Sequence, residues 1–492
     1  MSVDSILDLP AVDSFSGLPP QFYTRLEPQP LDQPRLLHAN AEVARMLGLS
    51  QAALARPEFL DVCAGTRGLA PGRTLAAVYS GHQFGVWAGQ LGDGRAHLLG
   101  EVAGPEGSFE LQLKGSGLTP YSRMGDGRAV IRSSVREYLA SEAMAGLGIP
   151  TTRALALVTA RNPVYRETVE RAAVVTRVSP TFVRFGSFEH WTQHPEQMRI
   201  LLDYVVDRFF PECREAQAGQ AQGEHGVLLR FLRAVVARSA RLVADWQTAG
   251  FCHGVMNTDN MSIVGLTLDY GPYGFMDAFQ INHVCNHTDS QGRYAWNTQP
   301  SVMHWNLYRL ASALAVLGPE PEDLRAELAH FEQDFLDAYH ANLVRKFGLR
   351  GWCEGDDTLV DDWWRLLHTQ QADFTLSFRR LAGAPQDPEP FLSLFSDREA
   401  AQAWLQGYAR RIGLDDRPQG ERIEHMNLAN PLYVLRNHLA EIAIRAAEND
   451  DPGQIDTLLE LLRAPYAERP GYETYAAPAP DWARQLHVSC SS

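Results

Sequence analysis

The hydrophobic pattern divides the chain into a strand-rich part followed by a helical part. Phe109, Leu111 and Leu113 alternate with polar residues, which is typical of a half-buried strand at 109–114. From 129 to 146, apolar residues recur about every four positions, which predicts a helix. The same reasoning predicts further strands at 96–102, 155–159 and 172–178.

Beyond about residue 195 the periodicity becomes helical. Apolar residues from Val227 to Trp246 follow one face of a long helix. Similar runs predict helices at 303–317 and 324–344. A short hairpin, formed by 261–264 and 266–269, is the strand signal expected within this part.

Length and element order together predict more than one lobe. The chain has 492 residues, whereas a single hydrophobic core seldom extends past about 250–300. A small strand-rich lobe before a larger helical lobe is an α+β arrangement, and the cleft between such lobes is a natural ligand site. We predict a proline-rich N-terminal extension (1–75) with a helix at 37–47 that wraps the core, a strand-rich lobe (76–190), a helical lobe (191–468) and a C-terminal tail (469–492).

Charge and composition exclude several classes of partner. Lysine plus arginine number 44 against 59 acidic residues, which gives a net charge of −15. We therefore expect no nucleic-acid partner, and a nucleotide would need a local basic pocket. No apolar stretch approaches the ~18 residues of a membrane span. Residues 1–20 lack Lys and Arg, unlike a secretory signal, and the six cysteines are too scattered for a disulfide scaffold, so we expect a cytoplasmic protein.

Three features of the strand-rich part follow the order found in the small lobe of protein kinases. Gly92 and Gly94 precede a strand, where backbone amides can approach phosphates and Arg95 adds charge. Lys114 ends the next strand, and Glu137 lies on the helix that follows. In a kinase, a strand lysine binds phosphate oxygens and a helix glutamate orients it. Each residue alone would also suit a turn or a solvated surface, but their order indicates a nucleotide site.

The helical part carries the second half of such a site. His253 precedes Asn260 by seven residues, as in the catalytic loop of kinases. Asp269 heads an Asp-Tyr-Gly run where kinases have Asp-Phe-Gly. Mg²⁺ prefers hard oxygen ligands, so Asn260 and Asp269 are the predicted metal ligands, together with phosphate oxygens. The alternative is two turns capped by Asn and Asp.

One position departs from the kinase pattern and changes the expected chemistry. Val255 stands where a kinase has its catalytic base, and valine cannot accept a proton. Asp259 lies beside the predicted metal ligand Asn260 instead. If Arg177 and Arg184 face the cleft, they create a phosphate site deeper than the usual one. Either the fold is inactive, or ATP binds differently and another reaction occurs.

A competing cluster of possible metal ligands lies at His283-Val284-Cys285-Asn286-His287. Its alternating donors could bind zinc together with Cys252 or His253. The spacing is not that of a standard zinc motif, and the chain has no CxxC pair. We therefore favour polar side chains in a loop over a zinc site.

Several longer runs resemble the selenoprotein O family. They are YSGHQFGVWAGQLGDGR at 79–95, LKGSGLTPYSR at 113–123, the loop 253–260, Asp-Tyr-Gly-Pro at 269–272 and the terminal Cys-Ser-Ser at 490–492. These motifs are long and span most of the chain. The resemblance implies a protein-kinase-like fold of two lobes that lacks the kinase base.

The resemblance also implies an activity and a set of site residues. It implies that ATP binds in a flipped orientation with Mg²⁺ or Mn²⁺, and that AMP passes to Ser, Thr or Tyr hydroxyls of target proteins. UTP is an alternative donor, because bacterial members are reported to transfer UMP. Asp259 is then the proton acceptor, Glu137 supports Lys114, and Asn260 and Asp269 hold the metal. The nucleotide-binding residues implied are Gly92, Gly94, Arg95, Lys114, Asp126, Gly127, Arg177, Arg184 and Asp269.

A cysteine near the C-terminus, Cys490, belongs to the same resemblance. Family members that lack selenocysteine carry a cysteine near this end. A thiol in a proline-rich tail suggests redox use, and Cys285, about sixteen residues past Asp269, is the predicted partner. A redox-sensitive Cys285–Cys490 disulfide would tether the tail near the active site. Two unrelated free thiols are the alternative.

Two other function classes stay open from the sequence. A kinase for a small molecule or a protein would transfer the γ-phosphate, and Val255 counts against it. An inactive scaffold would bind ATP for structure alone. The presence of Lys114, Asn260 and Asp269 counts against the scaffold, because structural binding does not need a complete metal set.

Overall fold

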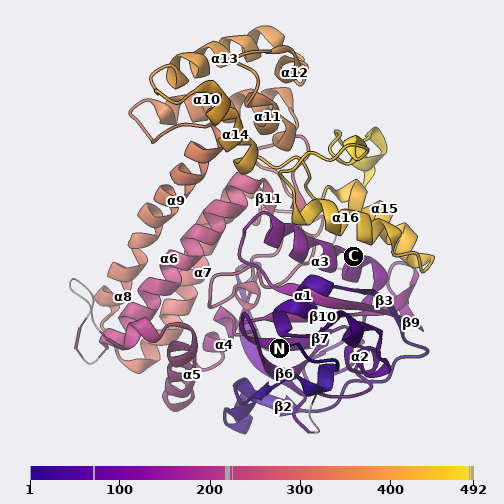
Figure 1. Ribbon diagram of the computed structural model, residues 1–492. Coiled ribbons are helices and arrows are strands. Elements are labelled where there is room, and N and C mark those ends of the chain that lie inside the picture. Colours follow the sequence, from indigo (N-terminus) through magenta and orange to yellow (C-terminus); the bar gives the residue numbers. More distant parts are fainter. Residues whose placement is uncertain (1, 70–71, 216–221, 224, 487, 489–492) are drawn as a thin grey trace.

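The structure, a computed structural model, describes residues 2–69, 72–215, 222–223, 225–486 and 488. It shows a strand-rich lobe, coloured indigo to purple in Figure 1, beside a larger helical lobe. The predicted α+β class with a kinase-like pair of lobes is confirmed.

An antiparallel sheet forms the strand-rich lobe. Its strands are β1 (Ala11–Val12), β2 (Tyr23–Arg25), β3 (Arg35–Ala39), β4 (Leu75–Gln83), β5 (Val86–Gly92), β6 (Ala96–Gly104), β7 (Gly107–Lys114), β8 (Ala129–Val130), β9 (Arg153–Tyr165) and β10 (Val169–Ser179). The order is β2-β4-β6-β7-β10-β9-β3, with β1 on β6, β5 on β4 and β8 on β10. The four strands predicted within this lobe are confirmed, and each is longer than the pattern indicated.

Helices make up most of the second lobe and flank the first. They are α1 (Ala41–Leu47), α2 (Pro57–Cys63), α3 (Ile131–Gly146), α4 (Phe185–Glu189), α5 (Pro195–Phe209), α6 (Gly226–Ala249), α7 (Gln299–Leu314), α8 (Pro321–Leu328), α9 (His330–Lys346), α10 (Asp356–Gln370), α11 (Phe374–Leu381), α12 (Glu389–Leu392), α13 (Arg398–Ile412), α14 (Gln419–Ala429), α15 (Asn437–Glu448) and α16 (Gly453–Arg463). The predicted helices at 129–146, 227–246 and 303–317 correspond to α3, α6 and α7. Among the described residues, none of these helices combines the length and apolar character needed to cross a membrane.

Three predicted elements differ from the structure. The expected helix at 37–47 begins only at Ala41, because the Asn40 side chain accepts hydrogen bonds from two N–H groups of the first turn and leaves β3 free to pair with β9. The expected helix at 324–344 is divided into α8 and α9. This division lets α8 contact both α6 and α7 while α9 runs along α6.

The predicted hairpin of 261–264 with 266–269 is reduced to one isolated bridge, between Met261 and Thr267. The backbone of this segment pairs outward instead. Ser262 bridges to Arg184, and Thr267 bridges to Thr151. The segment therefore ties the two lobes together next to Asp269, and it does not extend as a separate ribbon.

The two ends of the chain both contribute to the strand-rich lobe. Strands β1, β2 and β3 of the first 75 residues join the sheet, and α1 and α2 pack on its outer face. Helices α15 and α16, yellow in Figure 1, return from the helical lobe to pack against α3. The opposite sheet face shares one continuous core with α3, α5, α6 and α7. This shared core holds the lobes in one arrangement around the site.

Candidate functional site

A cavity of about 570 Å³ lies where the sheet meets the segments that follow α6. Seven basic and four acidic side chains line it, so it is locally positive in a chain of net charge −15. The structure brings together most of the predicted site residues here, namely Gly92, Gly94, Arg95, Lys114, Asp126, Gly127, Arg177, Arg184, Asp259 and Asp269. Three others, Glu137, Asn260 and Cys285, are not among the lining residues.

The glycine run at the cavity has a packing role that the sequence did not show. Gly92 ends β5 with φ +154°, and a Cβ there would lie 2.4 Å from the Tyr121 ring and 2.8 Å from the carbonyl oxygen of Ala77. Any larger residue would push the loop after β7 away from the sheet. Gly92 is therefore needed to shape the cavity.

Lys114 belongs to a buried ionic network at the base of the cavity. Its Nζ lies 2.8 Å from Glu137 Oε2 and also pairs with Asp269 Oδ1. Arg177 Nη1 lies 3.2 Å from both Glu137 Oε1 and Asp269 Oδ1. Burial alone would raise the pKa of Asp269, but the Lys114 and Arg177 charges outweigh it and hold that pKa well below its usual range. The network thus contains an ionised carboxylate between two cations.

Arg184 is the second deep cation of the cavity. Only 4% of this residue is exposed, and its Nη1 donates to the Asp259 carbonyl oxygen at 2.9 Å. The guanidinium carbon lies 4.4 Å from the centroid of the Tyr79 ring, and Nη2 lies 4.0 Å from Asp93 Oδ1. The side chain is held in place by these contacts without a short bidentate ion pair, so its charge is available to the cavity.

Asp259 has the properties of a proton acceptor. Its Oδ2 accepts a hydrogen bond from Gln83 Nε2 at 3.1 Å, whereas its buried Oδ1 has no hydrogen-bond partner among the described residues. Burial is the main cause that raises the pKa of Asp259 to about 6, and the nearby Arg184 partly opposes it. A carboxylate whose pKa is raised toward neutrality is a better base than an exposed aspartate.

The loop before Asp259 explains why the kinase pattern is altered. Gly254 has φ +76°, and a Cβ would lie 2.3 Å from the Pro272 carbonyl oxygen, so no arginine fits there. Val255 is buried, and its N–H donates to His253 Nδ1 at 3.3 Å. Burial lowers the pKa of His253 to about 4, which keeps the ring neutral. His253 is a structural residue of this loop.

The donors near Asp269 fit a hard divalent cation. Every hydrogen bond and ion pair that the described residues make to the Asp269 carboxylate involves Oδ1, which leaves Oδ2 unpaired. Asn260 is half-buried, and its Nδ2 donates to the Val255 carbonyl oxygen at 3.0 Å. This bond leaves Asn260 Oδ1 for a ligand. Two oxygen donors that complement phosphate oxygens suit Mg²⁺ or Mn²⁺.

More exposed residues surround the mouth of the cavity. Arg95 and Arg123 are exposed, and neither has an ion-pair partner within the described part of the chain. Asp126 is held by Arg166 at 2.7 Å, which is the main cause that lowers the pKa of Asp126. Gly127 is buried beneath it. The mouth therefore offers two unpaired guanidinium groups to an anionic ligand.

Several residues of the site escaped sequence reasoning. Gln83 contacts Asp259 across 176 positions of the chain, and a spacing of that size leaves no local signal. Thr258 accepts from the His82 N–H at 2.8 Å and donates to buried Glu189. These bonds hold the loop of Asp259 against β4. The only signal was that His82 and Gln83 lie in the run that resembles the selenoprotein O family.

The predicted disulfide stays a prediction, because Cys490 lies outside the described residues. Cys285 is packed behind the loop of Gly254, and its Sγ donates to the Pro272 carbonyl oxygen at 3.0 Å. Burial raises the pKa of the Cys285 thiol well above its usual value. The His287 N–H donates to the Val488 carbonyl oxygen at 2.9 Å, so the tail reaches this segment two residues before Cys490.

The zinc alternative gains no support from the geometry. In the part of the chain that the structure describes, no group of three or more His, Cys, Asp or Glu side chains is arranged to hold a metal ion. Burial lowers the pKa of His283, and Cys285 is turned toward backbone carbonyl groups.

Comparison with known proteins identifies the family. The family model described as "Protein adenylyltransferase SelO" matches residues 6–463. A relative from Bordetella parapertussis, named protein nucleotidyltransferase YdiU, is 64% identical over 488 residues and covers 99% of both chains. Relatives of the same name from Ralstonia nicotianae and Burkholderia multivorans are each 51% identical, over 98% and 99% of this chain and 95% and 96% of their own. The family match covers nearly the whole chain, and most of the expected site residues lie in one basic cavity. The chain therefore belongs to the SelO family.

Proposed function

We propose that this protein transfers AMP from ATP to hydroxyl groups of Ser, Thr or Tyr residues in target proteins and releases pyrophosphate. UTP is an alternative donor of the same chemistry. The observation that carries the proposal is that two buried arginine side chains lie deep in the cavity. Arg177 and Arg184 are each 4% exposed and line the same cavity as Lys114, so the strongest anion site lies inside the cavity.

The charge distribution supports a reversed orientation of the nucleotide. The β- and γ-phosphates carry most of the negative charge of ATP, and we place them against Arg177 and Arg184. The α-phosphorus then lies toward Asp259 and the exposed mouth, where a protein hydroxyl can approach. Attack at this phosphorus forms the new P–O bond, and the bond to pyrophosphate breaks. The buried cations stabilise the charge that develops on this leaving group.

Asp259 is the residue we assign to the hydroxyl proton. Its carboxylate lines the cavity and can accept the proton as the oxygen attacks, while Gln83 Nε2 donates to Oδ2 and orients the group. Val255 stands where a kinase has its catalytic base and cannot accept a proton. This difference counts against transfer of the γ-phosphate. Mg²⁺ or Mn²⁺, held by Asn260 and Asp269, would neutralise phosphate charge when bound. The nucleotide and a protein substrate are the partners this assignment requires.

Replacement of Arg184 by Met is expected to weaken ATP binding at least about tenfold while AMP binding changes little. The reason is that Arg184 is placed against the β- and γ-phosphates, which AMP lacks. Equilibrium binding of both nucleotides checks this result, and Arg184→Lys is the matched control that keeps the charge. Equal losses for ATP and AMP would contradict the reversed orientation.

Replacement of Asp259 by Asn is expected to lower kcat for AMP transfer about a hundredfold with little change in the KM for ATP. The amide keeps the size and the contact with Gln83 but cannot take a proton. Steady-state kinetics with a fixed protein acceptor measure the split. Replacement of the exposed Asp362 by Asn is the control for a neutralised carboxylate. A variant with unchanged kcat would remove Asp259 from the proposed role.

A further inference from the structure

The chain contains 42 arginines but two lysines, Lys114 and Lys346. Both lysines are buried, although lysine is ordinarily a surface residue. Both positions therefore depart from the arginine that supplies almost every other positive charge of the chain. A lysine differs from arginine in having a compact head group that can lose its proton. Lys114 belongs to the nucleotide cavity, whereas Lys346 has no part in it.

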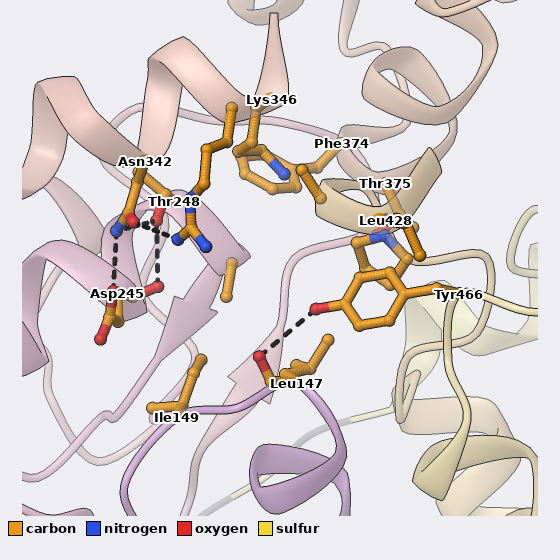
Figure 2. Close-up of a pocket in the computed structure, with 14 residues that line it drawn as sticks. Leu147, Ile149, Asp245, Thr248, Asn342, Lys346, Phe374, Thr375, Leu428 and Tyr466 are labelled. Atoms are coloured by element: carbon orange, nitrogen blue, oxygen red, sulfur yellow. Dashed lines mark hydrogen bonds between the residues drawn. The ribbon is translucent and has the colours of Figure 1, made fainter. Parts of the chain in front are cut away.

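Lys346, the last residue of α9, lines a second cavity of about 80 Å³ (Figure 2). The walls come from the ends of α6, α9 and α14, the start of α11, the segment between α3 and β9, and the chain after α16. No lining residue is shared with the nucleotide cavity. The space is sufficient for several waters or one small molecule.

The Lys346 amine has no carboxylate partner among the described residues. Its Nζ lies 4.2 Å from the centroid of the Phe378 ring and 5.9 Å from that of Phe374, and Figure 2 shows the amine beside the Phe374 ring. Asp245, the acid that lines this cavity, accepts a hydrogen bond from Asn342 Nδ2 at 2.7 Å. Aromatic faces offset only part of the cost of burying an ammonium group. The amine is therefore a buried cation in need of an anion.

The walls select among small anions. Phe374, Leu428 and Pro431 give one side an apolar surface that suits an alkyl group. A phosphate dianion would require several charge-assisted donors. Arg345 also lines the cavity, and its Nη2 donates to Asn342 Oδ1 at 2.6 Å, which ties that end of the guanidinium to α9. A monoanion with a short apolar body matches the Lys346 ammonium group beside this apolar wall, and Arg345 adds a second cation to the lining. We propose that the cavity at Lys346 binds a small monocarboxylate through the protonated Lys346 side chain.

Protonation of Lys346 gives this site a defined pH dependence. Burial, together with the Arg345 charge, lowers the pKa of Lys346 to about 7. Binding needs the ammonium form, so carboxylate affinity should fall about tenfold for each pH unit above that value. The other titratable or charged groups that line the cavity are Asp245 on α6, Arg345 on α9 and Tyr466 after α16. Burial raises the pKa of both Asp245 and Tyr466, and Arg345 stays charged.

The two-lysine composition makes the test direct. Full-length protein labelled with ¹³Cε-lysine gives two side-chain NMR signals, and Lys346→Met assigns them. Acetate is titrated at constant ionic strength against chloride, and inorganic phosphate is titrated separately. We expect acetate to shift the Lys346 signal along a saturating curve, with a weaker response above the pH at which that signal itself titrates. The Lys114 signal reports separately on any anion that enters the nucleotide cavity.

The wild-type titration does not depend on the folding of any variant. As a second readout, acetate should raise the Tm of the wild-type protein by mass action, and Lys346→Met and the cavity-filling Ala429→Leu should each weaken this effect at least about tenfold. A Lys346 signal that does not move with acetate, or moves without saturating, would overturn the site. A response to phosphate but not to acetate would overturn the carboxylate class.

Discussion

Replacement of Asp269 by Asn is expected to abolish AMP transfer, with a loss of at least about a thousandfold in kcat/KM. The carboxylate is the charged ligand proposed for the metal, and it also lies between Lys114 and Arg177 in the buried network. The amide keeps the shape but removes the negative charge. Both the metal and the alignment of the two cations are therefore lost in one substitution.

The measurement is the rate of nucleotide transfer to a fixed protein acceptor, with the Tm recorded for each variant. Asp334→Asn is the matched control, because Asp334 forms an ion pair with Arg233 in the helical lobe and does not line the cavity. This control should keep wild-type transfer. If a folded Asp269→Asn variant also kept it, the assignment of the metal site would be wrong.

Replacement of Lys114 by Met is expected to lower transfer by two to three orders of magnitude, since such charge contacts are worth roughly 3–4 kcal/mol in a transition state. In the proposed site, the Lys114 ammonium group is the point charge assigned to the phosphates, and Glu137 Oε2 lies 2.8 Å from its Nζ. Lys114→Arg should rescue little of the loss, because a planar guanidinium does not fit a buried position built around an ammonium group.

The same kinetic measurement checks this prediction, with Arg325→Gln as a control for the loss of a charge on the exposed face of α8. The ratio of the Lys114→Met and Arg325→Gln transfer rates separates the loss of a charge in the cavity from the loss of a charge on the surface. Wild-type transfer by a folded Lys114→Met protein would show that the lysine does not contact the nucleotide.

The site residues that could be predicted from the sequence are those located by a local pattern, such as the periodicity of a strand or helix or a short motif. Lys114 follows from an alternating strand, and Glu137 follows from a helix of period four. Their 2.8 Å ion pair agrees with the expected order of elements. Asp269 follows from the Asp-Tyr-Gly run that it heads, about nine residues after Asn260. In each case the neighbouring residues in the sequence indicate the position of the functional side chain.

The residues missed are those whose roles depend on contacts between distant segments. Gln83 and Glu189 act through Asp259 and Thr258, and no spacing in the chain connects these pairs. The helix expected at 37–47 starts four residues later than predicted, because the Asn40 side chain caps it at Ala41 and the residues before the cap form β3. No local pattern marks Lys346, because its burial without an acidic partner is created by the packing of α6, α9 and α11.

The central claim is that the deep cations hold the leaving pyrophosphate and leave the α-phosphorus open to attack. ATP labelled at either the α- or the γ-phosphorus tests it directly, with Mg²⁺ or Mn²⁺ and a protein acceptor. The account predicts that label from α-ATP becomes attached to protein while label from γ-ATP is released as pyrophosphate. Protein labelled from γ-ATP but not from α-ATP would contradict it and establish a kinase.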